Sequence, residues 1–296
     1  DYAATALAVA KKLGIAQGED ECMTGYELER LDDGELAKRI RRASVFARVS
    51  PDHKVRIVKA LKADGNITAM TGDGVNDAPS LKCADIGIAM GKTGTDVARQ
   101  ASDMILTDDN FATIERAIEE GRGIYENIKK SVIFLLSSNF GEIATMFAAV
   151  AAGLSSPLKS SHILWVNLIT DSLPALALGV DKNDGAQMMA RPPRKAGESL
   201  FARGGWFYTI FYGFLIAALS LTAFFYIPWE MATEAGRGLT FKELSAILAE
   251  EGVLTRAQTY AFTVLGLSEL FHAVGMRNVD CSVFSAGFGS NRLMAA

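Results

Sequence analysis

The distribution of hydrophobic and charged positions divides the chain into two parts. Charged residues concentrate in residues 1 to about 130, whereas the remainder contains long apolar runs separated by polar loops. A transmembrane helix needs about 20 predominantly apolar residues. Runs of this length occur at approximately 131–154, 162–180, 205–227 and 258–276. The pattern therefore predicts a soluble part followed by a bundle of four transmembrane helices over residues 131–296.

The soluble part, residues 1–120, alternates short β-branched runs with helical segments. This alternation is typical of an α/β domain with a doubly wound parallel sheet. A long helix is predicted from Phe111 to Lys130, with residues 121–130 forming a stalk that leads into the first apolar run. The other predicted elements are strands at Ile67–Met70, Ile86–Met90 and Met104–Leu106, and helices at Ala78–Ala84 and Thr95–Ser102.

The charges that flank the apolar runs predict their orientation, because Lys and Arg near membrane ends stay on the cytoplasmic side. The long loop Pro228–Arg256 is richer in Glu than in Lys and Arg, and its segment Thr240–Glu251 is interpreted as a loop helix outside the cytoplasm. Both ends of the chain are therefore predicted to be cytoplasmic. The basic residues behind this prediction are Lys129 and Lys130 before the first run, and Lys182, Arg191, Arg194, Lys195 and Arg203 after the second.

Composition narrows the class of protein further. The chain is 49% hydrophobic and 22% charged, with a net charge of −4 and no basic stripe interleaved with aromatics, which argues against nucleic-acid binding. Cys22, Cys83 and Cys281 are widely spaced and are interpreted as reduced structural thiols. The sequence begins at Asp1 directly in a helical pattern, without an initiator Met, so we expect it to be a fragment of a longer protein.

The segment MTGDGVNDAP, Met70–Pro79, places two carboxylates and an amide on one short loop after a predicted strand. Parallel sheets bind ligands at the carboxyl ends of their strands. Asp73 and Asp77 could hold a hard cation such as Mg²⁺ beside a phosphoryl group, with Asn76 between them. Lys54 is a candidate to supply a fixed positive charge to the same phosphoryl group. An ordinary Asp/Gly turn and a solvated Lys are the alternatives.

A second Gly-rich segment, GIAMGKTGT, ends in GKT but is not a phosphate-binding P-loop. The P-loop motif needs Gly where this sequence has Ile86, and Gly87 comes one residue too late. We interpret the segment as a structural turn.

Polar residues inside the apolar runs predict an ion site. Charged side chains are expensive in a bilayer and usually face a partner, a cavity or an ion. Oxygen ligands without Cys or Met favour a hard cation, and Ca²⁺ tolerates irregular coordination. Hydrogen bonding between helices is the alternative for the amides and the hydroxyl, and His272 is interpreted as packed. The candidate ligands are Asn139 and Glu142, three residues apart in the first run, and Asn167, Thr170 and Asp171, at i, i+3 and i+4 in the second, where unwound backbone is expected near Pro174 and Gly179. Glu269 in the fourth run could complete the set, and a snorkelling or helix-pairing carboxylate is the alternative for it.

A series of motifs along nearly the whole chain resembles the P-type ATPases. Among them, the resemblance is to the calcium pumps of the sarcoplasmic and endoplasmic reticulum type and their bacterial relatives, in which the motifs follow one another in the same order. The motifs are FARVSPDHK, ITAMTGDGVNDAPSLK, ADIGIAMG, DMILTDDNF, EEGRGIYENIKK, SSNFGE, WVNLITDSLPALALG and MARPPR. The resemblance implies a partial, haloacid-dehalogenase-like phosphorylation domain followed by family helices five to eight. It implies a Mg²⁺ and hinge site at Asp73 and Asp77, contact of Lys54 with the aspartyl phosphate, and Ca²⁺ ligation by the six candidate residues.

Several parts of that family's pattern do not occur in these residues. They include the phosphorylated Asp of DKTGT, the TGES loop, the nucleotide-binding domain and the remaining transmembrane helices. We therefore expect these 296 residues alone to be inactive, and the intact parent to couple ATP hydrolysis to Ca²⁺ export from the cytoplasm, in a membrane that short loops suggest is a bacterial plasma membrane. The alternatives are a pump for Na⁺, K⁺, H⁺ or Mn²⁺, a phosphatase of the haloacid dehalogenase group with a membrane anchor, or a non-catalytic membrane partner of a pump.

Overall fold

The computed structural model describes residues 2–182, 185–194, 197–236, 240–250, 252–278 and 291–295. The predictions that concern Asp1, Lys195, Glu251 and Cys281 fall outside these residues. The chain forms two compact units, Asp1–Ile118 with Pro192–Glu198, and Glu119–Arg191 with Ser199–Ala296. Cys22 and Cys83 are free thiols.

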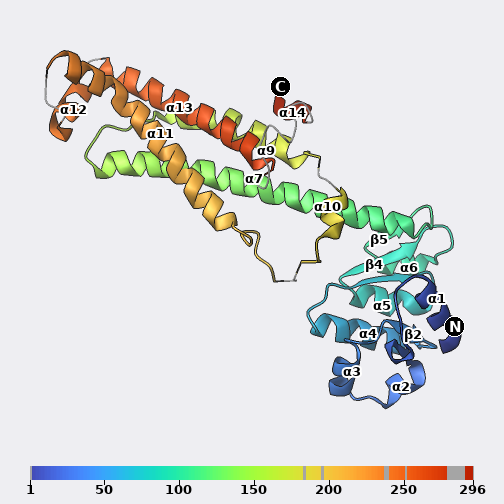
Figure 1. Cartoon of the computed structure of the whole chain (residues 1–296). Coiled ribbons are helices and arrows are strands. Elements are labelled where there is room, and N and C mark those ends of the chain that lie inside the picture. The colour runs from blue at the N-terminus through green and yellow to red at the C-terminus, as the bar shows by residue number, and fades with distance from the viewer. Residues whose placement is uncertain are drawn as a thin grey trace. The chain divides into compact units, whose positions relative to one another are not determined.

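The first unit alternates helices with short strands, as the sequence pattern predicts (Figure 1). Strands β3, β4 and β5 form a parallel sheet in that order, and β1 pairs in parallel with β2 in a separate small sheet. The α/β fold class is therefore confirmed. The elements are α1 (Ala3–Lys12), β1 (Cys22–Thr24), α2 (Gly25–Arg30), α3 (Asp33–Arg39), β2 (Val45–Ala47), α4 (Pro51–Ala63), β3 (Ala69–Gly72), α5 (Ala78–Cys83), β4 (Ile86–Met90), α6 (Asp96–Ala101) and β5 (Met104–Leu106), with 3₁₀ turns at Glu19–Glu21 and Val75–Asp77.

Strands β4 and β5 have the predicted bounds, but β3 begins two residues later than predicted. The Asp85 carboxylate accepts hydrogen bonds from the Thr68 backbone N–H (2.9 Å) and hydroxyl (3.0 Å), so a side chain binds this residue before the ladder begins. Pairing in the sheet runs from Ala69 to Gly72. The strand therefore continues to the residue immediately before Asp73.

The Gly-rich turn after β4 is structural, in agreement with its interpretation from the sequence. The Asp109 carboxylate accepts hydrogen bonds from the backbone N–H groups of Gly91 (2.6 Å), Lys92 (3.0 Å) and Thr93 (2.8 Å). Hydrogen bonds from the Lys92 and Thr93 backbone outweigh burial and lower the pKa of Asp109 to about 2. A carboxylate of the chain itself thus accepts the backbone N–H groups of this turn.

The second unit is helical. Figure 1 shows α11 and α13 side by side, with α7 running along the same bundle. Helix α7 is 40 residues long and continues through the predicted stalk, as expected. The described helices are α7 (Ala112–Ala151), α8 (Ser160–Trp165), a π-helical turn (Val166–Asp171), α9 (Ser172–Gly179), α10 (Gly185–Ala190), α11 (Gly205–Glu234), α12 (Phe241–Leu248), α13 (Val253–Met276) and α14 (Arg292–Ala295).

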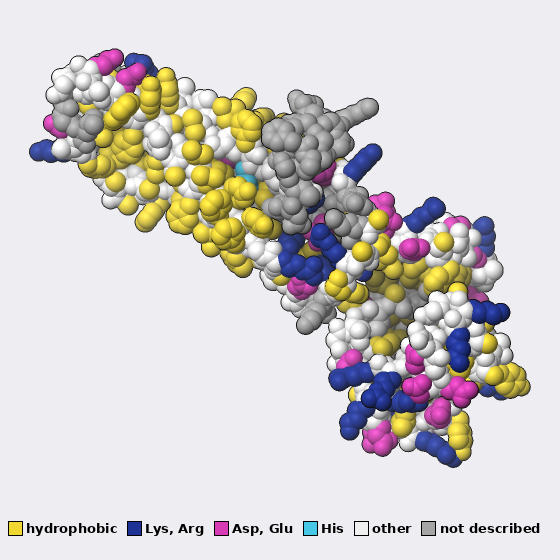
Figure 2. Space-filling model, in the orientation of Figure 1, with side chains coloured by type: hydrophobic (Ala, Val, Ile, Leu, Met, Phe, Trp, Pro, Cys, Tyr) yellow, Lys and Arg dark blue, Asp and Glu magenta, His cyan; other side chains and the backbone are white. Residues whose placement is uncertain are grey.

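Two of the described helices, α7 and α11, are long and apolar enough to cross a membrane. Hydrophobic side chains cover much of the visible surface of the helical unit (Figure 2). The predicted second run falls on the successive segments α8, the π-helical turn and α9, and the predicted fourth run falls within α13. The assignment of all four runs as spans stays a prediction.

Close packing between α7 and α11 depends on a glycine. A Cβ atom added at Gly213 of α11 would lie 2.3 Å from Cδ1 of Phe140 and 3.1 Å from the carbonyl oxygen of Ser137 on α7. Such distances leave no room for a larger residue, so Gly213 allows the two helices to approach closely next to Asn139.

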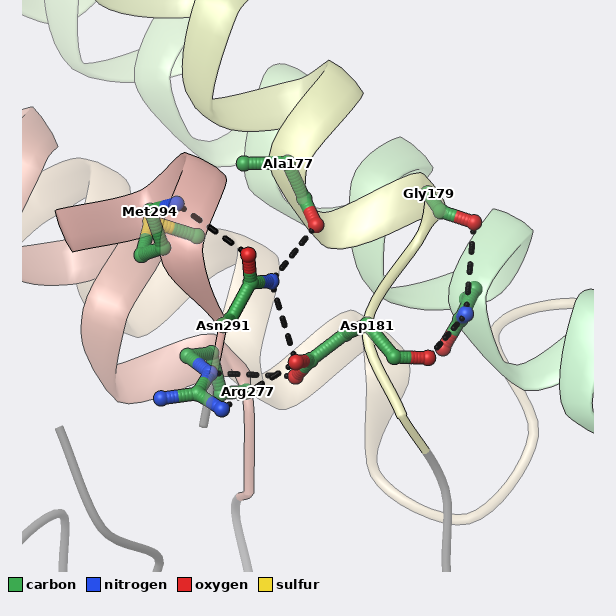
Figure 3. Close-up of polar contacts among 7 residues, drawn as sticks. Ala177, Gly179, Asp181, Arg277, Asn291 and Met294 are labelled. Carbon is green, nitrogen blue, oxygen red and sulfur yellow. Dashed lines mark hydrogen bonds and ion pairs between the residues drawn. The ribbon is translucent and has the colours of Figure 1, made fainter. Parts of the chain in front are cut away.

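A buried ion pair joins the ends of α9 and α13. Arg277 lies with its Nε 3.1 Å from Oδ2 of Asp181, and both residues are less than 10% exposed. Asn291 donates to the Asp181 carboxylate (3.0 Å) and to the carbonyl oxygen of Ala177 (2.8 Å), as Figure 3 shows. On α7, Asn127 donates to the carbonyl oxygen of Asp181 (2.8 Å). One network therefore ties α7, α9 and α13 together.

We predict that Arg277→Leu lowers the free energy of unfolding by about 3 kcal/mol, because it removes the guanidinium that is paired with the buried Asp181 carboxylate. Thermal unfolding of the detergent-solubilised full-length protein, followed by tryptophan fluorescence, measures the effect. Arg256→Leu, at an exposed position on the same helix, is the matched control. An equal shift in both variants would contradict a specific role of the ion pair.

We also predict that Asp109→Asn speeds amide hydrogen exchange at Gly91, Lys92 and Thr93, whereas the neighbouring Asp108→Asn does not. Because folding lowers the pKa of Asp109 from 3.8 to about 2, its ionised form stabilises the turn at neutral pH, and this contribution is lost as pH falls through about 2. Exchange rates corrected for their intrinsic pH dependence test both statements. Equal protection in the two variants would be inconsistent with them.

Candidate functional site

Polar side chains meet in the first unit where β3 ends. The strand stops at Gly72, and Asp73 and Gly74 lead into the 3₁₀ turn Val75–Asp77 and then into α5. The Asp73 carbonyl oxygen accepts a hydrogen bond from the Thr95 N–H (2.8 Å), which ties this loop to the start of α6. The loop therefore has a defined path at the carboxyl end of a parallel strand, where ligands of such sheets bind.

Lys54 reaches this loop because α4 begins at a well-defined residue. The Ser50 hydroxyl accepts a hydrogen bond from the His53 N–H (3.3 Å), and Pro51 is the first helical residue. Lys54 thus lies in the first turn, where its Nζ is 2.6 Å from Oδ1 of Asp77. The structure brings together two of the predicted catalytic residues that are 23 positions apart in the chain.

The Asp77 carboxylate is held in its ionised form. Burial acts to raise its pKa, but the hydrogen bond from Lys54, the bond from the Gly74 N–H and the charge of Lys54 outweigh burial, so the pKa of Asp77 lies below its ordinary value. Oδ2 accepts the Gly74 N–H at 3.2 Å. Both carboxylate oxygens are therefore engaged. A Cβ atom at position 72 would lie 2.5 Å from that of Asp77, so Gly72 is required for this packing.

Asp73 and Asn76 are placed differently from Asp77. Both side chains are exposed, and in the described part of the chain neither makes a hydrogen bond or ion pair with another side chain. Asp73 thus presents a free carboxylate beside the partly buried Lys54–Asp77 pair. Mg²⁺ commonly binds through one or two carboxylates and keeps several waters, so Asp73 fits such an ion better than Asp77 does.

A second group of polar residues lies inside the helical unit. Glu142 comes from α7, Asp171 from the π-helical turn and Glu269 from α13, and these side chains are 6%, 2% and 0% exposed, respectively. Glu142 Oε1, Asp171 Oδ1 and Glu269 Oε1 are buried without a hydrogen-bond partner among the described residues. Unsatisfied buried polar atoms are costly and rare. Their presence on three different helices therefore points to a missing ligand.

Neighbouring hydrogen bonds connect these carboxylates to the predicted amides and hydroxyl. Thr170 Oγ1 donates to Glu269 Oε2 at 3.0 Å, and Asn139 Nδ2 lies 3.4 Å from Asp171 Oδ2. Asn167 is exposed and donates to the carbonyl oxygen of Ile163 (2.9 Å). Hydrogen bonds thus join two pairs of the six predicted ligands, Thr170 with Glu269 and Asn139 with Asp171. In the described residues no three acidic, His or Cys side chains form a metal cluster by themselves.

The backbone at Asp171 differs from that of a regular α-helix. Residues Val166–Asp171 form a π-helical turn, and the Ser172 hydroxyl donates to the carbonyl oxygen of Asn167 (2.8 Å). Pro174 lacks an N–H group and therefore cannot donate to the carbonyl oxygen of Thr170. The sequence predicted unwound backbone near Pro174 and Gly179. The structure instead widens the helix just before Pro174, and Gly179 is the last residue of α9.

The structure also shows the surroundings of two further polar residues, Ser138 and His272. Ser138, a residue that the sequence pattern did not single out, is fully buried on α7 directly before Asn139, and its hydroxyl has no hydrogen-bond partner among the described residues. His272 packs against Phe134 and Tyr212, with its Nε2 2.5 Å from the Ser137 hydroxyl. His272 is therefore packed, as predicted.

Comparison with known proteins covers both units. Residues 155–296 match the family described as cation transporting ATPase, C-terminus, and residues 1–85 match the family of haloacid dehalogenase-like hydrolases. Calcium-transporting ATPase 1 of Bacillus cereus is 53% identical over 99% of this chain and 32% of its own length. Calcium-transporting ATPase of Bacillus subtilis is 46% identical over 96% of this chain and 30% of its own length.

A mouse protein, calcium-transporting ATPase type 2C member 2, is 41% identical over 99% of this chain and 29% of its own length. The chain thus spans about a third of the length of the curated relatives it matches. Because these relatives align with nearly all of its residues, and two family matches cover both of its units, the chain belongs to the P-type cation-transporting ATPases.

Proposed function

We propose that the protein of which this chain forms part is a P-type pump that uses ATP hydrolysis, through an aspartyl phosphate, to export Ca²⁺ from the cytoplasm. The observation that carries the proposal is the set of three buried carboxylates, Glu142, Asp171 and Glu269, each with an oxygen lacking a partner among the described residues. The relatives named above are calcium-transporting ATPases, which supports Ca²⁺ over other hard cations.

In this proposal the first unit recognises the phosphoryl group. Lys54 supplies a fixed positive charge, and Asp77 orients Lys54 through their 2.6 Å ion pair. Asp73 would hold Mg²⁺ together with phosphoryl oxygens and water, and the ion would neutralise negative charge on the phosphoryl group. Asn76 lies exposed in the same loop, where its amide can donate to phosphoryl oxygens. The phosphorylated Asp would come from another part of the full-length protein.

The helical unit would bind the transported ion. Carboxylates of Glu142, Asp171 and Glu269 supply charge, and oxygens of Asn139, Asn167 and Thr170 complete part of the coordination. Ca²⁺ accepts six to eight oxygens in flexible geometry, which suits ligands that come from separate helices. Other ligands would come from the remainder of the protein. The distribution of Lys and Arg supports an orientation with both ends of this chain in the cytoplasm, and the short loops favour a bacterial plasma membrane.

We predict that Asp171→Asn in the full-length protein abolishes Ca²⁺-dependent ATP hydrolysis, because it removes a buried charge that contacts Asn139 and lies beside Thr170. ATP hydrolysis measured over a range of free Ca²⁺ concentrations tests this. Thr222→Ala, at an exposed position of α11, should leave turnover unchanged. Unchanged turnover in the Asp171 variant would rule out the assignment, and activation by Na⁺, K⁺ or Mn²⁺ instead of Ca²⁺ would reassign the ion.

We further predict that Lys54→Met lowers ATP turnover by roughly 100-fold, the usual effect of removing one electrostatic contact to a reacting group. Lys54→Arg should retain more activity, because it keeps the charge near Asp77. Lys59→Met, an exposed residue on the same helix, is the matched control. Turnover in Lys54→Met equal to that of the control would contradict the role of Lys54.

A further inference from the structure

A basic cavity lies within the helical unit. It has a volume of about 300 Å³, and its lining includes Lys129, Lys130, Arg191 and Arg203, together with one acidic residue, Glu126. Figure 2 shows Lys and Arg side chains gathered at the edge of the hydrophobic surface of this unit. Basic side chains thus outnumber acidic ones among the lining residues.

The cations are held together by the fold. Lys129 and Lys130 are neighbours on α7, and Lys129 Nζ donates to the carbonyl oxygen of Ala202 at 3.0 Å, which brings the segment before α11 close to α7. Arg203 follows directly, with a left-handed backbone (φ 60°). The charges of Arg191 and Arg277 both act on Lys130, whereas Glu126 and Asp181 attract it. Gathering several like charges in a cavity favours an anionic ligand.

The lining of the cavity also includes apolar residues. Ile133, Tyr208 and Met276 line it, and they come from α7, α11 and α13. Lys129 and Lys130 immediately precede the first predicted span, and Arg203 lies two residues before the start of α11, so the cavity lies where polar surface gives way to apolar helix. Basic pockets between helices at this level suit anionic lipid headgroups.

The surface next to the cavity also fits lipid. Trp206 and Phe207, in the first turn of α11, are 60% and 64% exposed, and Phe211 and Phe214 continue this exposed aromatic surface at 49% and 58%. Exposed aromatic residues at the start of an apolar helix are typical of a membrane–water interface. A ligand with both an anionic head and apolar chains would contact the cavity and this surface together.

We propose that this cavity binds the phosphoryl headgroup of an anionic membrane phospholipid, whose acyl chains lie along the exposed aromatic surface of α11. Inorganic phosphate shares the phosphoryl chemistry but has no group to contact Phe207, Phe211 or Phe214. A cavity that binds phospholipid should therefore retain the lipid in the presence of inorganic phosphate, whereas a cavity that binds free phosphate should not.

The test uses the full-length protein extracted from vesicles that contain equal amounts of phosphatidylcholine and phosphatidylglycerol, with bound lipid counted by native mass spectrometry. The wild-type protein should retain phosphatidylglycerol in preference to phosphatidylcholine. The double variant Lys129→Gln with Arg203→Gln should retain it roughly 30-fold more weakly, because two basic contacts are lost. The charge-keeping pair Lys129→Arg with Arg203→Lys should retain more.

Arg256→Gln is the matched control, because it removes one exposed positive charge from the opposite end of α13. If the double variant does not fold, Arg203→Gln alone changes only an exposed residue and tests the same contact. Loss of lipid in the control equal to that in the cavity variants would overturn the proposal. So would equal retention of phosphatidylcholine, or displacement of the lipid by an equal concentration of inorganic phosphate. None of these readouts depends on Ca²⁺ or ATP.

Discussion

The arrangement of the helical unit depends on the burial of three carboxylates in apolar surroundings. An ionised side chain at the centre of a bilayer costs roughly 3 kcal/mol or more on insertion scales. Glu142, Asp171 and Glu269 each retain an oxygen without a partner among the described residues, so the hydrogen bonds from Thr170 and Asn139 offset only part of this cost. In the function proposed above, a cation satisfies this cluster, so helix packing and ion binding would depend on the same residues.

The π-helical turn Val166–Asp171 contacts two neighbouring helices, α7 and α13. Successive helical residues point in different directions, and in this segment Thr170 contacts Glu269 of α13 whereas Asp171 faces Asn139 of α7. A π-helical turn often marks a functional position in a helix. The ion pair between Asp181 and Arg277 holds the ends of α9 and α13 together beyond this turn. The relative position of Thr170 and Glu269 therefore depends on contacts at some distance from them.

Local chemistry decided which features could be predicted from the sequence. Strands β4 and β5 have the predicted bounds because Asp and Gly residues interrupt the chain beside them, and polar residues in apolar runs identified the carboxylates. Strands β1 and β2 were missed, and they pair with each other across 23 positions of the chain. The Asp181–Arg277 pair was also missed, since its partners are 96 positions apart. Sequence spacing cannot show contacts that only tertiary packing creates.

The carboxylate of Asp109 has a further consequence for the chemistry of the first unit. Backbone N–H groups gathered in a turn attract anions, and a cell contains abundant phosphate and nucleotides. A carboxylate attached to the same chain competes with them at an effective concentration in the millimolar range or above. By acting as its own ligand, the turn at Gly91–Thr93 is closed to free phosphate, so that soluble phosphates do not collect next to the loop that carries Asp73.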